Sequence, residues 1–147
     1  MHWPQVNSMR TTLGVIIGAS FVGFIDSLYL TVDHFISLPL PCSLLHGCDI
    51  VLHSAYSMVG PIPLAAFGVV FYLFVGFITL YILTSPTPVP QRLINLLMLS
   101  GVAGAVMSLG FELFQYFVLH ALCQYCALSA LCSFVICGCV VFAHLKR

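Results

Sequence analysis

Four long apolar stretches alternate with short polar segments along the chain. They cover residues 13–32, 62–83, 93–119 and 122–145, and each can cross the hydrocarbon core of a bilayer, which takes about 20 residues in a helix. Because a bilayer leaves unpaired backbone groups without a hydrogen-bond partner, we expect all four to be helices. The pattern predicts an all-α integral membrane protein, a single domain over residues 1–147 built as a four-transmembrane-helix bundle.

The connection over residues 33–61 is the longest, and we expect it to be an outer loop. Within it, Val51, Ala55 and Met58 recur at helical spacing. This spacing predicts a short amphipathic interfacial helix that lies on the membrane surface and covers the mouth of the bundle. Residues 85–90 contain three prolines and predict a tight turn, because proline cannot continue a helix.

The composition agrees with this pattern and excludes a water-soluble domain. The hydrophobic fraction is 61%, the charged fraction is 5% and the mean hydropathy is +1.14. A soluble domain could carry such values only by covering most of its surface with apolar atoms. The formal net charge is zero, and we expect membrane lipid as a partner but no nucleic acid.

The few basic residues mark one side of the predicted bundle: Arg10, Arg92, Lys146 and Arg147. By the positive-inside rule this side is cytoplasmic. We therefore expect both termini inside, and the loop over residues 33–61 and the turn near His120 outside. A cleaved signal peptide would also place an apolar run after a basic residue. Here the run is as long as a full span, and no small-residue cleavage site follows it.

Two pairs of cysteines lie near the outer ends of the predicted helices. Cys42 and Cys48 fall in the long loop, and Cys123 and Cys126 form a Cys-x-x-Cys motif where the last stretch begins. Thiols outside the cytoplasm can form and keep disulfides, and a helix N-terminus stabilises a thiolate. Two dithiols at one membrane surface can exchange a disulfide, which indicates an electron relay. A zinc site or static disulfides are the alternatives.

The other three cysteines fall deeper in the last stretch: Cys132, Cys137 and Cys139. Small, weakly polar residues are ordinary packing material in membrane helices, and we expect that role here. A soft-metal transporter or binding protein of the mercury-resistance kind is an alternative from another class. Such pathways use thiols within the first spans, whereas the first three stretches here contain no cysteine.

Several short motifs accompany the cysteines. The outer loop carries Cys42 and Cys48, with Ser54 and Tyr56 six and eight positions after the second cysteine. The others are Ser27-Leu28-Tyr29, Gly60-Pro61-Ile62-Pro63, Phe67-Gly68, Tyr72 and Cys123-Gln124-Tyr125-Cys126. With this set, which spans nearly the whole chain, the sequence resembles the vitamin K epoxide reductase family, in its bacterial disulfide-forming branch.

The resemblance implies a thiol oxidase of the bacterial inner membrane, with four helices around a quinone, either ubiquinone or menaquinone. It implies that Cys42 exchanges with a thioredoxin-like oxidoreductase of the periplasm. We expect this partner to be a separate protein, because the sequence contains no thioredoxin-like domain. Cys48 would pass the exchange to Cys123, and Cys126 would deliver two electrons to the quinone. The residues carried over near the quinone pocket are Ser54 and Tyr56.

The chain also departs from the family pattern. The loop pair is spaced Cys-x5-Cys, closer than the family usually shows. Animal members carry a tyrosine four residues after the last active cysteine and an asparagine shortly before Phe-Gly. This chain has Ala130 at the first position and no asparagine in the region before Phe67. Reduction of vitamin K quinone or its epoxide is therefore the alternative activity. The other four-helix disulfide generator of bacterial membranes is a further alternative. In that family the Cys-x-x-Cys pair comes first and the wider pair second, the reverse of the order here, which argues against it.

Reducing a quinone to a quinol takes two protons as well as two electrons. Asp26 and Glu112 are the acids well inside the predicted spans, each about two turns from the outer surface at the rise of an α-helix. Ionisable residues at such depth usually face the protein interior. We expect both near the quinone, as hydrogen-bond donors or proton carriers, with a structural role as the alternative. His120 precedes Cys123 by three residues and is a candidate for stabilising a thiolate.

Overall fold

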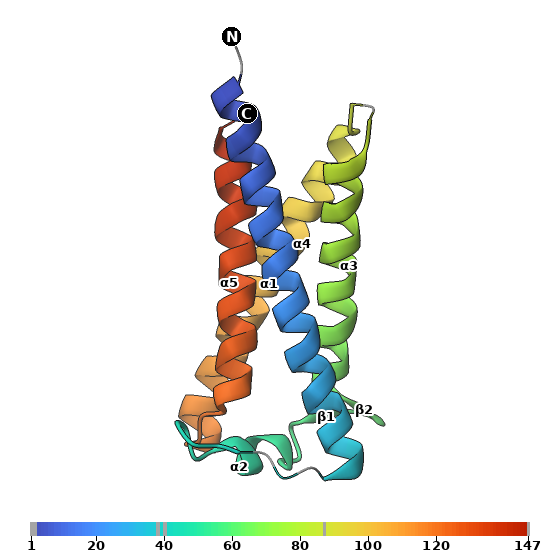
Figure 1. Ribbon diagram of the computed structural model, residues 1–147. Coiled ribbons are helices and arrows are strands. Elements are labelled where there is room, and N and C mark those ends of the chain that lie inside the picture. Colours follow the sequence, from blue (N-terminus) through green and yellow to red (C-terminus); the bar gives the residue numbers. More distant parts are fainter. Residues whose placement is uncertain (1–2, 38, 40, 87, 147) are drawn as a thin grey trace.

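The computed structural model describes residues 3–37, 39, 41–86 and 88–146 and consists mainly of helices (Figure 1). The long helices are α1 (Trp3–Ile36), α3 (Leu64–Thr84), α4 (Gln91–Phe114) and α5 (Gln124–Leu145), and a π-helical turn, η1 (Gln115–Leu119), continues α4. Among the described residues, four segments are long and apolar enough to cross a membrane: Ser8–Ile36, Leu64–Thr84, Gln91–Leu119 and Gln124–Leu145. The predicted four-helix membrane bundle is confirmed.

Helix α1 is longer at both ends than the apolar stretch 13–32. No proline or glycine interrupts residues 33–36, so the helix continues to Ile36. Ser37 then has left-handed backbone geometry (φ 52°), and its N–H donates to the carbonyl oxygen of Asp33 (2.8 Å), as at many helix ends. The placement of Asp33 in the outer loop was therefore wrong, because this residue lies in α1 with its side chain only 1% exposed.

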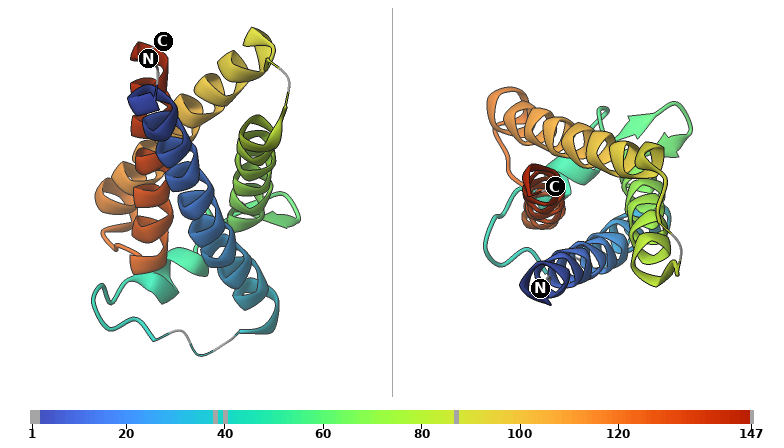
Figure 2. Two further views of the ribbon diagram at one scale, coloured as in Figure 1. Left: turned by 45° about the horizontal axis from the view of Figure 1, so that its top comes forward. Right: turned by 90° about the horizontal axis from the view of Figure 1, so that it is seen from above.

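The termini and the cysteine-bearing segments lie at opposite ends of the bundle. Both termini and the connection between α3 and α4 are at one end, which we call the terminal end (Figure 1). The short helix α2 (Cys48–Leu52) and the antiparallel strands β1 (Met58–Val59) and β2 (Ile62–Pro63) are at the other, the thiol end. The views in Figure 2 show that the segment with α2 passes across the thiol end.

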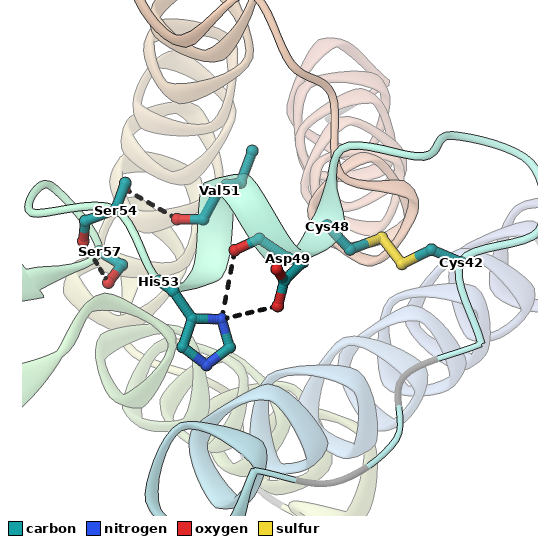
Figure 3. A network of polar contacts seen from close by, with 7 residues as sticks. All are labelled: Cys42, Cys48, Asp49, Val51, His53, Ser54 and Ser57. Atoms are coloured by element: carbon teal, nitrogen blue, oxygen red, sulfur yellow. Dashed lines mark hydrogen bonds and ion pairs between the residues drawn. A yellow bond between two sulfur atoms is a disulfide. The ribbon is translucent and has the colours of Figure 1, made fainter.

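The interfacial helix is shorter than its apolar spacing predicts. Helix α2 ends at Leu52, so the expectation that Ala55 and Met58 continue it was wrong. Two serine hydroxyls form local bonds to the backbone instead: Ser54 Oγ donates to Val51 O and Ser57 Oγ to Ser54 O, each at 2.8 Å (Figure 3). Such bonds compete with helical hydrogen bonding. Gly60, with φ 63°, then forms the turn between β1 and β2.

Helix α1 packs against α3 and α5, and α5 also packs against α4. Tyr72 of α3 lies at the centre of this packing, and a Cβ atom on Gly23 of α1 would come within 2.4 Å of its ring. The Tyr72 hydroxyl is hydrogen-bonded to Ser129 O (2.6 Å) and Ser133 Oγ (3.0 Å) of α5. Small residues and interhelical hydrogen bonds are the usual means of joining membrane helices. The buried core also includes Leu13, Ile16, Val75, Leu97, Ile136 and Val140.

Candidate active site

The four cysteines of the two pairs meet at the thiol end of the bundle. Cys42 and Cys48 form a disulfide with their Cα atoms 6.3 Å apart (Figure 3), while Cys123 and Cys126 are free thiols. Cys48 and Cys123 are both completely buried in one apolar cluster, and Cys42 and Cys126 pack against it. The fold therefore places a disulfide and a dithiol in one packed group. The other buried members of this cluster are Leu30, Val51, Leu52 and Ala121.

One side chain of the Cys-x-x-Cys motif holds the outer loop on both sides of Cys42. The Gln124 amide nitrogen donates to the carbonyl oxygen of Pro41 (2.9 Å), and its amide oxygen accepts from the N–H of Leu44 (3.1 Å). The first residue between the two cysteines of the motif thus fastens the segment that carries the loop disulfide. Gln124 thus links the Cys-x-x-Cys motif to the residues that flank Cys42 in the loop.

The loop also touches the motif through its backbone. His46 and Cys123 form an isolated antiparallel β-bridge, and the next residue, Gly47, packs directly on the chain before Cys123. A Cβ atom on Gly47 would lie 2.7 Å from both N and O of Leu122 and 2.9 Å from the Ala121 Cβ. Because two of these atoms belong to the backbone, they cannot move aside as a flexible side chain could. Only glycine allows this approach, which brings Cys48 to Cys123.

We expect Gly47→Ala to slow the formation of a Cys48–Cys123 disulfide by roughly tenfold or more. Overpacking typically costs about 1–3 kcal/mol, and about 1.4 kcal/mol corresponds to a factor of ten. The measurement is the rate of oxidation in a Cys42→Ala/Cys126→Ala background, where these two thiols can pair. Gly18→Ala is the matched control, because nothing lies within 4 Å of its added Cβ. Equal rates for the two variants would show that Gly47 does not position Cys48.

Cys123 is the N-cap of α5, and its sulfur accepts from the N–H of Cys126 (3.5 Å). The pKa of the Cys123 thiol lies below its usual value, chiefly because the Cys126 thiol hydrogen-bonds it, with further hydrogen bonds from the backbone of Cys126 and Tyr125. Burial and the nearby Asp26 oppose this shift. A thiol with a lowered pKa leaves a disulfide more readily. Cys123 is therefore suited to be the leaving sulfur when a third thiol attacks a disulfide that Cys123 forms.

Gln115 holds both cysteines of the motif from the π-helical turn. Its side chain is 5% exposed, and its amide oxygen accepts from the N–H of Cys123 (3.2 Å), while the same side chain hydrogen-bonds the Cys126 thiol. The Gln115 carbonyl oxygen also accepts from the N–H of Ala121 (3.3 Å). Single π-helical turns are frequent at functional sites. Here the turn places one amide where it bonds the backbone N–H of Cys123 and the thiol of Cys126.

Each of the two predicted acids lies close enough to act electrostatically on one cysteine of the Cys-x-x-Cys motif. Asp26 of α1 is 6% exposed, its Oδ2 has no hydrogen-bond partner among the described residues, and it acts electrostatically on Cys123. Glu112 of α4 is half-buried and acts electrostatically on Cys126. Asp33 is a third acid in this half of the bundle, and neither of its carboxylate oxygens has a partner within the described ranges.

Three predicted site residues remain: Ser54, Tyr56 and His120. Ser54 donates its hydroxyl to Val51 in the loop. Tyr56 is 61% exposed, and its ring packs edge-on against Phe114 of α4, with the ring centroids 5.0 Å apart. His120 is exposed and has left-handed backbone geometry at the end of η1 (φ 49°). Ser54 thus contacts the loop, Tyr56 contacts α4, and His120 ends the π-helical turn.

The cysteines deeper in α5 belong to the packing of the helices. Cys132 is a buried member of the central core, and Cys139 packs against the same core. Cys137 is half-buried, and its Cα would lie 3.7 Å from a Cβ atom on Gly101 of α4. Over the part of the chain that the structure describes, no three residues of the His, Cys, Asp and Glu types come together as metal ligands would.

Sequence reasoning missed three residues that build this site: Gly47, Gln115 and Gln124. One signal was available for Gln115, because a glutamine within an otherwise apolar run is costly to bury without partners. Gly47 and Gln124 adjoin cysteines in the sequence, but their roles depend on contacts with a distant segment. No pattern within either segment reports such contacts.

The comparison with known proteins adds one finding. A protein-family model described as the Vitamin K epoxide reductase family matches residues 14–141. This range includes all four cysteines of the two pairs, together with Gln115 and both acids. A search among curated proteins gave no match.

Proposed function

Since the chain belongs to the vitamin K epoxide reductase family, whose members are oxidoreductases that use quinones, we propose that it is a membrane thiol oxidase. Electrons pass from a thioredoxin-like partner through Cys42 and Cys48 to Cys123 and Cys126, and from there to a quinone. The observation that carries this proposal is the burial of Cys48, from the loop disulfide, in the same cluster as Cys123 from the dithiol.

The first step is attack of a partner thiolate on the sulfur of Cys42. Cys42 is partly exposed whereas Cys48 is fully buried, which supports Cys42 as the sulfur that a protein partner reaches. The attack breaks the Cys42–Cys48 bond, forms a partner–Cys42 disulfide and releases the Cys48 thiolate. The partner's second thiol then displaces Cys42. The partner leaves as a disulfide, and the loop pair becomes a dithiol.

The second step moves the disulfide between the two pairs. The Cys48 thiolate attacks Cys123 of an oxidised Cys123–Cys126 pair, and Cys126 leaves as a thiolate. Cys42 then attacks Cys48, and Cys123 leaves, so the loop disulfide forms again while the motif becomes a dithiol. The lowered pKa of Cys123 supports its role as leaving group in this step. The observed pairing, with the loop oxidised and the motif reduced, corresponds to the product of this exchange.

In the last step the dithiol gives two electrons to the quinone and becomes a disulfide, while the quinone takes up two protons and becomes a quinol. The carboxyls of Asp26 and Glu112 pass protons to the quinone and take up those that the two thiols release. We assign Cys126 to the electron transfer, with Ser54 and Tyr56 near the quinone pocket. Gln115 would hold the Cys123 backbone and the Cys126 thiol in place. Ubiquinone and menaquinone both suit this reaction. For the orientation we propose a bacterial inner membrane, with both termini in the cytoplasm and the thiol end in the periplasm.

The test of the function uses the purified chain in detergent, a reduced thioredoxin-like protein and a short-chain quinone. We expect one quinone to be reduced for each partner disulfide formed. Absence of quinone reduction would overturn the proposal. Vitamin K epoxide, offered in place of the quinone, tests the alternative activity. Stoichiometric binding of Hg(II) with all thiols reduced, and no mixed disulfide, would instead support a soft-metal protein.

The carboxyls of Asp26 and Glu112 are proposed to supply protons to the quinone. We expect Asp26→Asn or Glu112→Gln to leave exchange between the cysteine pairs intact but to slow quinol formation, since a positioned acid or base is worth about 10²–10⁴-fold. Single-turnover quinone reduction by each prereduced variant measures the effect. If quinol formation in both variants slows by no more than about threefold, far less than this range, the two carboxyls have only a structural role.

A further inference from the structure

A cavity lies at the terminal end of the bundle, at the opposite end from the two cysteine pairs. Residues of all four long helices line it, and its volume is about 570 Å³, within the range of about 300–1,000 Å³ that small-molecule pockets occupy. The lining is apolar except for Arg10 of α1 and His144 of α5. Apolar lining residues come from each helix and include Leu13, Leu83, Leu97 and Val140.

The terminal end carries basic but no acidic side chains. Arg10, Arg92 and Lys146 lie near helix ends there, whereas all four acids of the chain lie toward the thiol end: Asp26, Asp33, Asp49 and Glu112. The acid of α1 nearest to Arg10 in sequence is Asp26, which is about 24 Å along the helix at 1.5 Å per residue. Arg10 therefore brings a positive charge to an apolar cavity without an acidic side chain to balance it.

We propose that this cavity binds an acidic phospholipid, with one acyl chain inside it and the phosphate on Arg10. A guanidinium binds phosphate oxygens through two parallel hydrogen bonds, and basic pockets between membrane helices bind acidic lipid head groups. The apolar lining suits an acyl chain. The head group supplies the negative charge that the terminal end of the bundle lacks. This proposal does not depend on the redox function, because it concerns the opposite end of the molecule.

Native mass spectrometry of the full chain tests the proposal with phosphatidylglycerol and phosphatidylcholine of identical acyl chains. The measured quantity is the lipid concentration at which half of the protein carries one lipid. A basic residue near the membrane surface attracts an acidic lipid by about 1 kcal/mol, so we expect about fivefold tighter binding of phosphatidylglycerol. Arg10→Gln should remove this preference. Arg92→Gln is the matched control, because Arg92 does not line the cavity, and it should keep the preference.

A third variant separates binding in the cavity from binding on the surface. Ala143→Trp fills space beside His144 and should weaken the binding of both lipids, since the acyl chain would lose its place. Equal binding of the two lipids by the parent would overturn the proposal. So would an equal loss in Arg10→Gln and Arg92→Gln, which would indicate diffuse surface charge. Displacement of phosphatidylglycerol by glycerol phosphate alone would show that the site holds a phosphate and no acyl chain.

Discussion

Cys126→Ala is expected to abolish quinone reduction while Cys42 remains open to capture by a carrier dithiol. The two pairs occupy different positions: Cys42 is partly exposed in the loop, whereas Cys126 lies in the first turn of α5, where Gln115 binds it and Glu112 acts on it. Without Cys126, the motif cannot form the disulfide whose electrons the quinone receives. The loop disulfide and its contacts remain, so attack on Cys42 should proceed as in the parent.

Two measurements check this expectation. Quinone absorbance should show no turnover above background, and a carrier whose second cysteine is replaced by alanine should still be trapped on Cys42 as a mixed disulfide. Cys137→Ala is a suitable control, because this half-buried thiol of α5 lies outside the apolar cluster that holds the redox pairs. Quinone turnover equal to that of the parent protein would remove Cys126 from the proposed mechanism.

Cys48→Ala should stop electrons from reaching the motif from the carrier, because the sulfur that attacks Cys123 is lost. Cys123 and Cys126 should still be oxidised by quinone, since Cys48 takes no part in that step. Turnover with a protein carrier should fall to background. A small dithiol that reaches the motif directly should restore quinone reduction, which separates a broken relay from a damaged quinone site. Unimpaired oxidation of the protein carrier would show that Cys48 is not the link.

The sequence predicts the membrane fold well, because the signals for it are local. Apolar length defines each span, and prolines define the turn between α3 and α4. The gathering of four cysteines at one end follows from counting spans between them. The boundaries are less accurate, as Asp33 shows: a polar residue can continue a membrane helix when no breaker follows and the folded protein buries it. Helix α2 is shorter than its apolar spacing predicts because serine hydroxyls bind the backbone there.

The contacts that assemble the site could not be predicted in the same way. Gly47 matters because of the Leu122 backbone, and Gln124 because of Pro41 and Leu44. Each contact joins two segments that are distant in sequence, and its effect depends on a fit of less than an ångström. Gln115 reaches both redox cysteines because the end of α4 widens into a π-helical turn. Neither apolar spacing nor residue type indicates that change of helical geometry.

The way Gln124 holds the outer loop bears on how the loop can open. Both of its hydrogen bonds are exposed to solvent, so water can replace them, and a solvated hydrogen bond contributes only about 0.5–1.5 kcal/mol net. Local opening in proteins begins where backbone bonds are exposed and apolar contacts are few. The segment around Cys42 meets this description, whereas Cys48 is anchored by full burial. We therefore expect the segment around Cys42 to open locally while Cys48 stays buried and the membrane helices stay folded.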